Sequence, residues 1–92
     1  MLLSAENINL KLKDLHDWKQ IGNAIEKEFH FKNFKEAMHF INEVAFIAEV
    51  QKHHPDWSNV YNKVHIKLTT HDFGGTTQKD IHLAAAIDAI IL

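Results

Sequence analysis

The sequence predicts an α+β domain of two layers, in which helices cover one face of an antiparallel β-sheet. Three observations predict this fold class. A hairpin signal, Gly22-Asn23, joins two short strand-like segments near the N-terminus. A long segment with apolar residues at helical spacing follows it. A further strand segment and a last helix give the order β-β-α-β-β-α, preceded by a short N-terminal helix.

The N-terminal third predicts this short helix and the hairpin. Residues 4–15 form the helix, because its first residue is a suitable N-cap serine and its apolar residues make a partial stripe. Residues 18–21 and 24–31 form the two strands. The two-residue turn places Lys19 opposite Glu26, which is a favourable cross-strand charge pair.

A long helix is predicted from the N-cap Asn33 to about Lys52. Pro55 disfavours the helical conformation at the residue before it, so His54 is extended and His53 is the last helical residue. Apolar residues cover more of this helix than one sheet contact requires, which self-association or deep burial can explain. The predicted buried stripe contains Phe34, Ala37, Met38, Ile41, Val44, Ala45 and Ala48, and leaves out Phe40, Ile47 and Val50.

The C-terminal part predicts a strand segment and a helix. Residues 60–70 alternate between apolar and polar side chains, and a bend at Asn62-Lys63 can divide them into two strands. Thr76 or Thr77 caps the last helix, and Asp80 lies in its first turn, where the helix dipole stabilises a carboxylate. The predicted apolar side of this helix contains Ile81, Ala84, Ala85, Ile87 and Ile91.

Composition restricts the class of protein. The 92 residues suit one domain, 1–92, and the net charge of −2 is unlike that of a nucleic-acid binder. No apolar run reaches the roughly 20 residues of a membrane helix. The first residues lack the features of a signal peptide. The absence of cysteine excludes disulfides and thiolate chemistry. We therefore expect a cytoplasmic protein that binds neither nucleic acid nor membrane.

Histidine is unusually frequent, with eight residues in the chain. Its side chain changes charge near neutral pH, which suits acid–base chemistry. Glu49 lies four residues before His53, and both this carboxylate and the end of the helix dipole favour a protonated imidazole. An exposed ion pair of little energetic value is the commoner result of this spacing. Four other histidines are expected on solvated faces: His16, His30, His39 and His82.

Several of these residues form one spaced set. It consists of Glu49, then His53-His54-Pro55, Tyr61 after five more residues, His71 after nine more, and Asp80 beyond. This set resembles the signature of the pterin-4a-carbinolamine dehydratase family, and the segments 29–34 and 53–64 resemble that family as well. The likeness covers about residues 14–91. A lone His-His-Pro would be weak support, whereas the full set is specific.

The resemblance implies the predicted fold, a homodimer or homotetramer, and a pterin substrate, with no metal and no organic cofactor. The family's active-site histidines correspond to His53, His54 and His71. Relatives often carry aspartate at position 52, so Lys52 changes the local charge. The residues that correspond to the substrate pocket or support it are Glu49, Lys52, Thr69, Thr70, Asp72 and Asp80.

The reaction implied is the loss of water from a 4a-hydroxytetrahydropterin, which gives the quinonoid dihydropterin in tetrahydrobiopterin recycling. A protonated imidazole can protonate the departing hydroxyl, and a neutral imidazole can accept the N5 proton. We expect His54 and His71 to flank the substrate and His53, assisted by Glu49, to be the acid. Asp80 orients a partner or caps its helix.

Three other interpretations remain open at this point. Histidines and a carboxylate could bind zinc, although adjacent histidines rarely ligate one ion and the two-histidine helix motif is missing. The chain could be a non-catalytic dimerisation or binding module of the same fold. The histidines could also be structural, which we expect of His30, His65 and His82.

Overall fold

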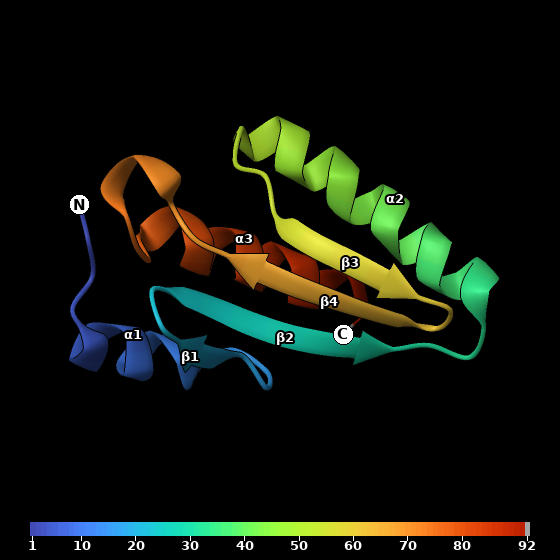
Figure 1. Cartoon of the computed structure of the whole chain (residues 1–92), viewed down its shortest axis with the longest axis horizontal. Helices are drawn as coiled ribbons and strands as arrows, with labels where there is room; N and C mark the ends of the chain where they lie inside the picture. The colour runs from blue at the N-terminus through green and yellow to red at the C-terminus, as the bar shows by residue number, and fades with distance from the viewer. Residues whose placement is uncertain (92) are drawn as a thin grey trace.

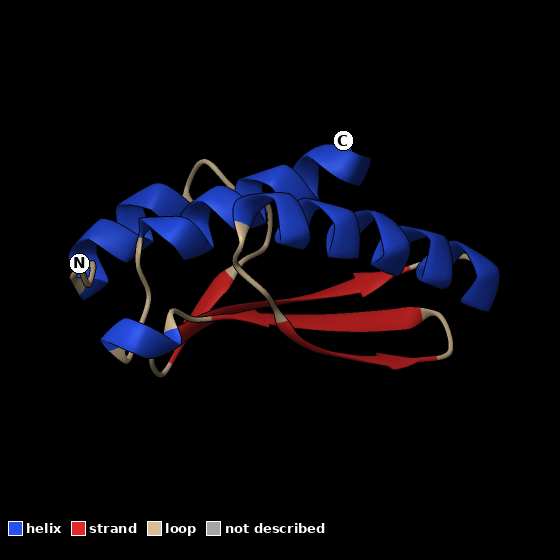
Figure 2. Ribbon diagram, turned by 90° about the horizontal axis from the view of Figure 1, so that it is seen from above, coloured by secondary structure: helices blue, strands red, loops and turns tan. Residues whose placement is uncertain are grey.

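The computed structural model describes residues 1–91, and the predicted α+β fold is confirmed. Four strands form one antiparallel sheet in the order β1-β2-β4-β3 (Figure 1). The two long helices lie side by side on one face of this sheet (Figure 2). The elements are α1 (Ala5–Leu12), β1 (Lys19–Ile21), β2 (Ala24–His30), α2 (Phe34–Gln51), β3 (Asp56–Val60), β4 (Lys63–Leu68), the 3-10 turn η1 (His71–Phe73) and α3 (Gln78–Ile91).

The first hairpin agrees with its prediction. β1 and β2 pair so that Lys19 lies opposite Glu26, and Ile21 opposite Ala24 closes the two-residue turn. Gly22 has a φ of +60°, which glycine adopts without steric cost and which a type II′ turn requires at its first position.

The second hairpin differs from its prediction. β3 begins at Asp56, four residues before the predicted strand, and the turn is Tyr61-Asn62 rather than a bend at Asn62-Lys63. β3 is an edge strand, so its outward side chains are polar or exposed and its inward ones are only half-buried. The apolar alternation by which a strand is recognised is therefore weak in this segment.

Helix α2 begins after Asn33, whose side-chain oxygen accepts a hydrogen bond of 2.9 Å from the N–H of Glu36, as predicted for an N-cap. The predicted stripe was wrong in two positions, because Phe40 is buried and Phe34 is about half exposed. Apolar residues surround much of this helix, so the sequence pattern does not fix which side faces the sheet. The buried residues of α2 are Ala37, Phe40, Val44 and Ala48.

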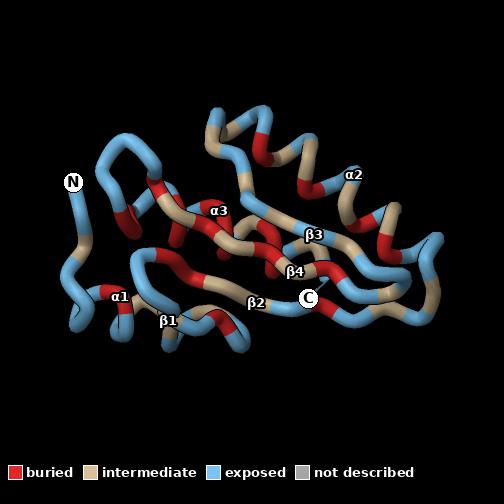
Figure 3. Tube along the Cα trace, in the orientation of Figure 1, coloured by how far each residue is buried: buried red, intermediate tan, exposed pale blue. Residues whose placement is uncertain are grey.

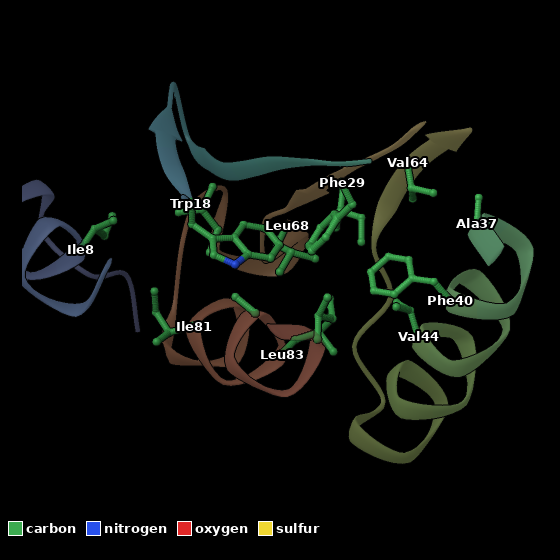
Figure 4. Packing of buried hydrophobic residues seen from close by; sticks show 14 residues of the cluster. Ile8, Trp18, Phe29, Ala37, Phe40, Val44, Val64, Leu68, Ile81 and Leu83 are labelled. Carbon is green, nitrogen blue, oxygen red and sulfur yellow. The ribbon is translucent and has the colours of Figure 1, made fainter. Parts of the chain in front are cut away.

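The core lies between the sheet and the helices α2 and α3 (Figure 4). The ring of Phe40 packs at 4.8 Å, centroid to centroid, against both Phe29 and Phe31. Leu83 on α3 is fully buried, whereas Ala85 and Ile91, which were predicted on the apolar side, are exposed. Helix α1, capped by Ser4, contributes the buried Ile8. None of the helices within residues 1–91 has the length and apolar character needed to span a bilayer.

Candidate active site

The end of α2 determines where the two adjacent histidines point. The helix ends at Gln51, and Lys52 takes the left-handed conformation with a φ of +54°. The N–H of Lys52 donates to the carbonyl of Glu49 at 3.2 Å, and that of His53 to the carbonyl of Ala48 at 3.1 Å. These two bonds form a Schellman motif. The prediction that His53 is helical was wrong, because the motif turns the chain one residue earlier.

His53 pairs with Asp80 across the fold. Its Nε2 lies 2.6 Å from Oδ1 of Asp80, and the two side chains are 10% and 0% exposed. The end of α2 and the start of α3 lie at the same end of the molecule, which permits this contact (Figure 1). A buried carboxylate needs such donors, because burial of an unpaired charge is costly.

Asp80 has two further donors on its other oxygen. Oδ2 accepts hydrogen bonds of 2.8 Å from the hydroxyl of Thr70 and from the backbone N–H of Thr77. The N–H of Lys79 in turn donates to the Thr77 hydroxyl at 3.2 Å, so Thr77 and Asp80 form a capping box at the start of α3. The predicted position of Asp80 in the first turn is confirmed, and its carboxylate also orients His53.

Glu49 pairs with His54 and not with His53, which corrects the predicted pairing. Glu49 Oε2 lies 2.5 Å from His54 Nε2, and the side chains are 77% and 64% exposed. The left-handed turn at Lys52 directs His53 towards the interior and leaves His54 at the surface beside α2. Water screens a pair this exposed, so its energetic contribution is small.

His71 follows β4 and begins the 3-10 turn η1. His71 and Asp72 are exposed, whereas the neighbouring residues on both sides of the turn become buried (Figure 3). Thr70 and Gly75 pair across the base of this loop, with a 2.8 Å bond from the N–H of Thr70 to the carbonyl of Gly75. The Thr69 hydroxyl donates to the carbonyl of Asn23 at 2.9 Å, which ties the loop to the first hairpin turn.

The structure brings some of the predicted site residues together and leaves others apart. Asp80 joins His53 to Thr70, the residue directly before His71, whereas the His71 side chain forms no hydrogen bond within residues 1–91. Lys52 is exposed beside it. Tyr61 is not part of this region, because it lies in the β3–β4 turn, at the opposite end of the hairpin (Figure 1).

Thr77 was identified from the sequence only as a candidate cap. Its spacing of three residues before Asp80 is the signal of a capping box. The four histidines predicted on solvated faces are exposed, and His65 pairs with Glu26 on the uncovered face of the sheet. Within residues 1–91 no three histidine or carboxylate side chains converge in a way that could hold a metal ion.

These features define a small α+β domain with a buried carboxylate–histidine pair and two exposed histidines at one end, an arrangement suited to acid–base chemistry. The family model for pterin 4 alpha carbinolamine dehydratase matches residues 1–90. The chain belongs to this family.

Individual relatives agree with this assignment. A protein of Christiangramia forsetii, provisionally named a pterin-4-alpha-carbinolamine dehydratase, is 47% identical over 97% of this chain and 92% of its own length. One of Sulfurisphaera tokodaii with the same provisional name is 46% identical over 97% and 96%. The crystal structure of a transcriptional coactivator/pterin dehydratase from Brucella melitensis superposes with a TM-score of 0.94, at 37% identity over 98% of both chains. A pterin dehydratase-like RuBisCO assembly factor of the alpha-carboxysome shares the fold, with a TM-score of 0.71 at 23% identity over 82% of this chain and 89% of its own.

Proposed function

We propose that this protein dehydrates a 4a-hydroxytetrahydropterin to the quinonoid dihydropterin by histidine acid–base catalysis, as a step of tetrahydrobiopterin recycling in the cytoplasm. The C4a–O bond breaks, the hydroxyl leaves as water with one added proton, and N5 loses its proton as the N5–C4a double bond forms. The observation that carries this proposal is the His53–Asp80 pair, in which a buried carboxylate holds an imidazole at 2.6 Å.

The three histidines have different surroundings, which supports different roles. His53 is held by Asp80, so it is the best-positioned group to give a proton to the leaving hydroxyl. His54 and His71 are exposed, which suits contact with a substrate that enters from solvent. Glu49 holds His54, and the remaining proposed substrate contacts are Lys52, Thr69 and Asp72. Thr70 is buried and is proposed to support the pocket through its bond to Asp80.

The test is stopped-flow dehydration of an enzymatically generated 4a-carbinolamine. Each of His53→Ala, His54→Ala and His71→Ala is expected to lower the rate by on the order of 10²–10⁴, the usual contribution of a positioned proton transfer. His82→Ala is the matched control, because His82 is exposed on α3 and outside the site. An undiminished rate in His53→Ala would reject His53 as the acid.

A wild-type protein that binds partners but never accelerates dehydration would favour the non-catalytic binding module instead. Metal analysis of untagged protein tests the zinc alternative in the same preparation. Stoichiometric zinc that is required for the rate would replace the metal-free mechanism.

We further propose that the protein forms a homodimer or homotetramer through α2. Phe46 and Val50 on the second half of this helix are 71% and 66% exposed. A separate open groove of about 1010 Å³, lined in part by the exposed Phe34 and Ile91, lies between the first half of α2 and the end of α3. Exposed apolar side chains grouped in this way are typical of interaction sites. Phe46→Lys should lower the mass measured by sedimentation, whereas Leu10→Lys, at an apolar residue on α1 that is 59% exposed, should not. A monomeric wild-type protein would refute the assembly.

A further inference from the structure

The hydroxyls of Thr77 and Thr70 form a short chain of hydrogen bonds that ends at the carboxylate of Asp80. The Thr70 Oγ1 lies 2.8 Å from Oδ2 of Asp80 and 2.6 Å from the Oγ1 of Thr77. All three residues are buried, with exposures of 4%, 4% and 0% for Thr70, Thr77 and Asp80. Bulk water therefore does not compete for these hydrogen bonds.

Elementary donor counting fixes the direction of this chain. A carboxylate can only accept, so the single proton of the Thr70 hydroxyl goes to Asp80. The contact between the two hydroxyls then requires Thr77 to donate to Thr70. The Thr77 oxygen remains free to accept the N–H of Lys79, which lies at 3.2 Å. Every proton in the chain is thereby assigned.

The same counting fixes the protonation of His53. Oδ2 of Asp80 receives the Thr70 hydroxyl and the Thr77 N–H, which leaves Oδ1 for the imidazole. Because Oδ1 only accepts, the neutral ring carries its proton on Nε2. Within residues 1–91 no hydrogen bond engages Nδ1 of His53, and no buried side-chain nitrogen or oxygen lacks a partner. Nδ1 therefore reaches the surface.

We propose that Thr77 is a positioning residue: its hydroxyl directs that of Thr70 to Oδ2 of Asp80, which keeps Oδ1 turned towards His53, so that the ring stays in its Nε2–H tautomer and presents Nδ1 as the atom that exchanges protons. In the imidazolium, Nδ1–H gives its proton to the departing hydroxyl, and the ring returns to the Nε2–H form. The assignment of the His53 tautomer rests on the hydrogen bonds alone, whereas the role of Nδ1 in proton exchange rests on the proposed dehydration.

Nitrogen NMR of the histidine rings tests the tautomer without substrate. Long-range proton–nitrogen spectra of uniformly labelled protein should show His53, assigned by its loss in His53→Gln, as the Nε2–H form. Thr77→Val removes the hydroxyl at nearly constant volume; the Thr70 hydroxyl then loses its fixed direction, the Asp80 carboxylate can turn away from Nε2, and the spectrum should show a mixture of tautomers. It should also lower kcat/KM for dehydration by on the order of tenfold, the lower end of the effect seen when a group that orients a metal-bound histidine is lost.

Two further variants separate positioning from general stability. Thr77→Ser keeps the hydroxyl and should restore both the spectrum and the rate. Thr76→Val is the matched control, because this buried neighbour bonds instead to the carbonyl of Asn23 at 3.2 Å, and it should change neither. If Thr77→Val does not fold, Thr70→Val interrupts the same chain one step later and should show the same spectral change.

Two results would overturn the inference: a wild-type His53 in the Nδ1–H form, or an unchanged His53 spectrum in folded Thr77→Val. A wild-type protein with the expected tautomer and no dehydration would refute the proposed function while supporting the positioning role. A protein that dehydrates the pterin with His53 in the other tautomer would refute the positioning role alone.

Discussion

Removal of the Asp88 side chain should destabilise the protein strongly, although Asp88 lies outside the candidate active site. Asp88 is on α3 and forms a 2.8 Å ion pair with Lys27 of β2, and the two side chains are only 4% and 9% exposed. The same carboxylate accepts hydrogen bonds from the indole of Trp18 at 3.0 Å and from the backbone N–H of His16 at 3.1 Å. It therefore connects the segment after α1, the sheet and α3.

The expected loss can be bounded from these contacts. Breaking a buried ion pair by removing one partner costs about 3–5 kcal/mol, because the other charge is left without compensation. The ring of Phe29, 4.6 Å from the Lys27 ammonium, stays beside that charge in the variant and compensates it in part, which reduces the cost by roughly 0.5–2 kcal/mol. The Trp18 indole and the His16 amide also lose their acceptor, at about 1–3 kcal/mol each, which exceeds that compensation. We expect Asp88→Ala to lose at least about 3–5 kcal/mol, which is much of the roughly 5–15 kcal/mol typical of a domain.

Urea unfolding followed by far-ultraviolet circular dichroism measures this loss. Asp14→Ala is the control, because Asp14 precedes the same segment but is exposed, and it should change the free energy of unfolding by less than about 0.5 kcal/mol. Replacement of both partners in Lys27→Met/Asp88→Leu should recover part of the loss, since no lone charge remains buried. A loss below about 1 kcal/mol in Asp88→Ala would refute the view that this pair is desolvated.

Three smaller effects should follow from local geometry. Asn33→Ala should lower the free energy of unfolding by about 1 kcal/mol through loss of the α2 cap, and an unchanged urea midpoint would contradict this. Lys52→Gly should raise it by about 0.5–1 kcal/mol, because relief of the left-handed conformation exceeds the entropic cost of glycine; a lower thermal midpoint would count against strain there. Glu49→Gln should change it by less than about 1 kcal/mol, with the small effect disappearing in high salt.

Local chemistry was sufficient to predict much of this fold. The Gly22-Asn23 turn, the Asn33 cap and the register that places Lys19 opposite Glu26 depend on residues close in sequence, and all three are confirmed. The Glu26 carboxylate itself contacts His65 across β4. The approximate extent of α2 follows from its cap and from Pro55 for the same reason. Such features are decided by backbone conformations and by single hydrogen bonds, which residue types encode directly.

Contacts that span the fold were not predictable in the same way. Phe40 is buried because Phe29 and Phe31 offer it aromatic partners, and the periodicity of α2 does not contain this information. The exchange of carboxylate partners, with Asp80 on His53 and Glu49 on His54, has a similar cause. Spacing in sequence brought Glu49 near both histidines, but the left-handed turn at Lys52 decides which one it reaches.

Tyr61 illustrates how a residue remote from the site can still determine its geometry. It adopts a φ of +51° in the β3–β4 turn, where the Asn59 side chain donates to its carbonyl at 3.1 Å. This turn pairs Val60 with Lys63, and the resulting register places Asp56 opposite Lys67. That register brings the start of β3, just after the two adjacent histidines, beside the end of β4, just before Thr70 and His71. A slip of one residue would move the side chains of β3 to the opposite face of the sheet and shift its start along β4. The place of Tyr61 in the spaced set of motif residues is therefore consistent with a role in setting the register rather than in contact with substrate.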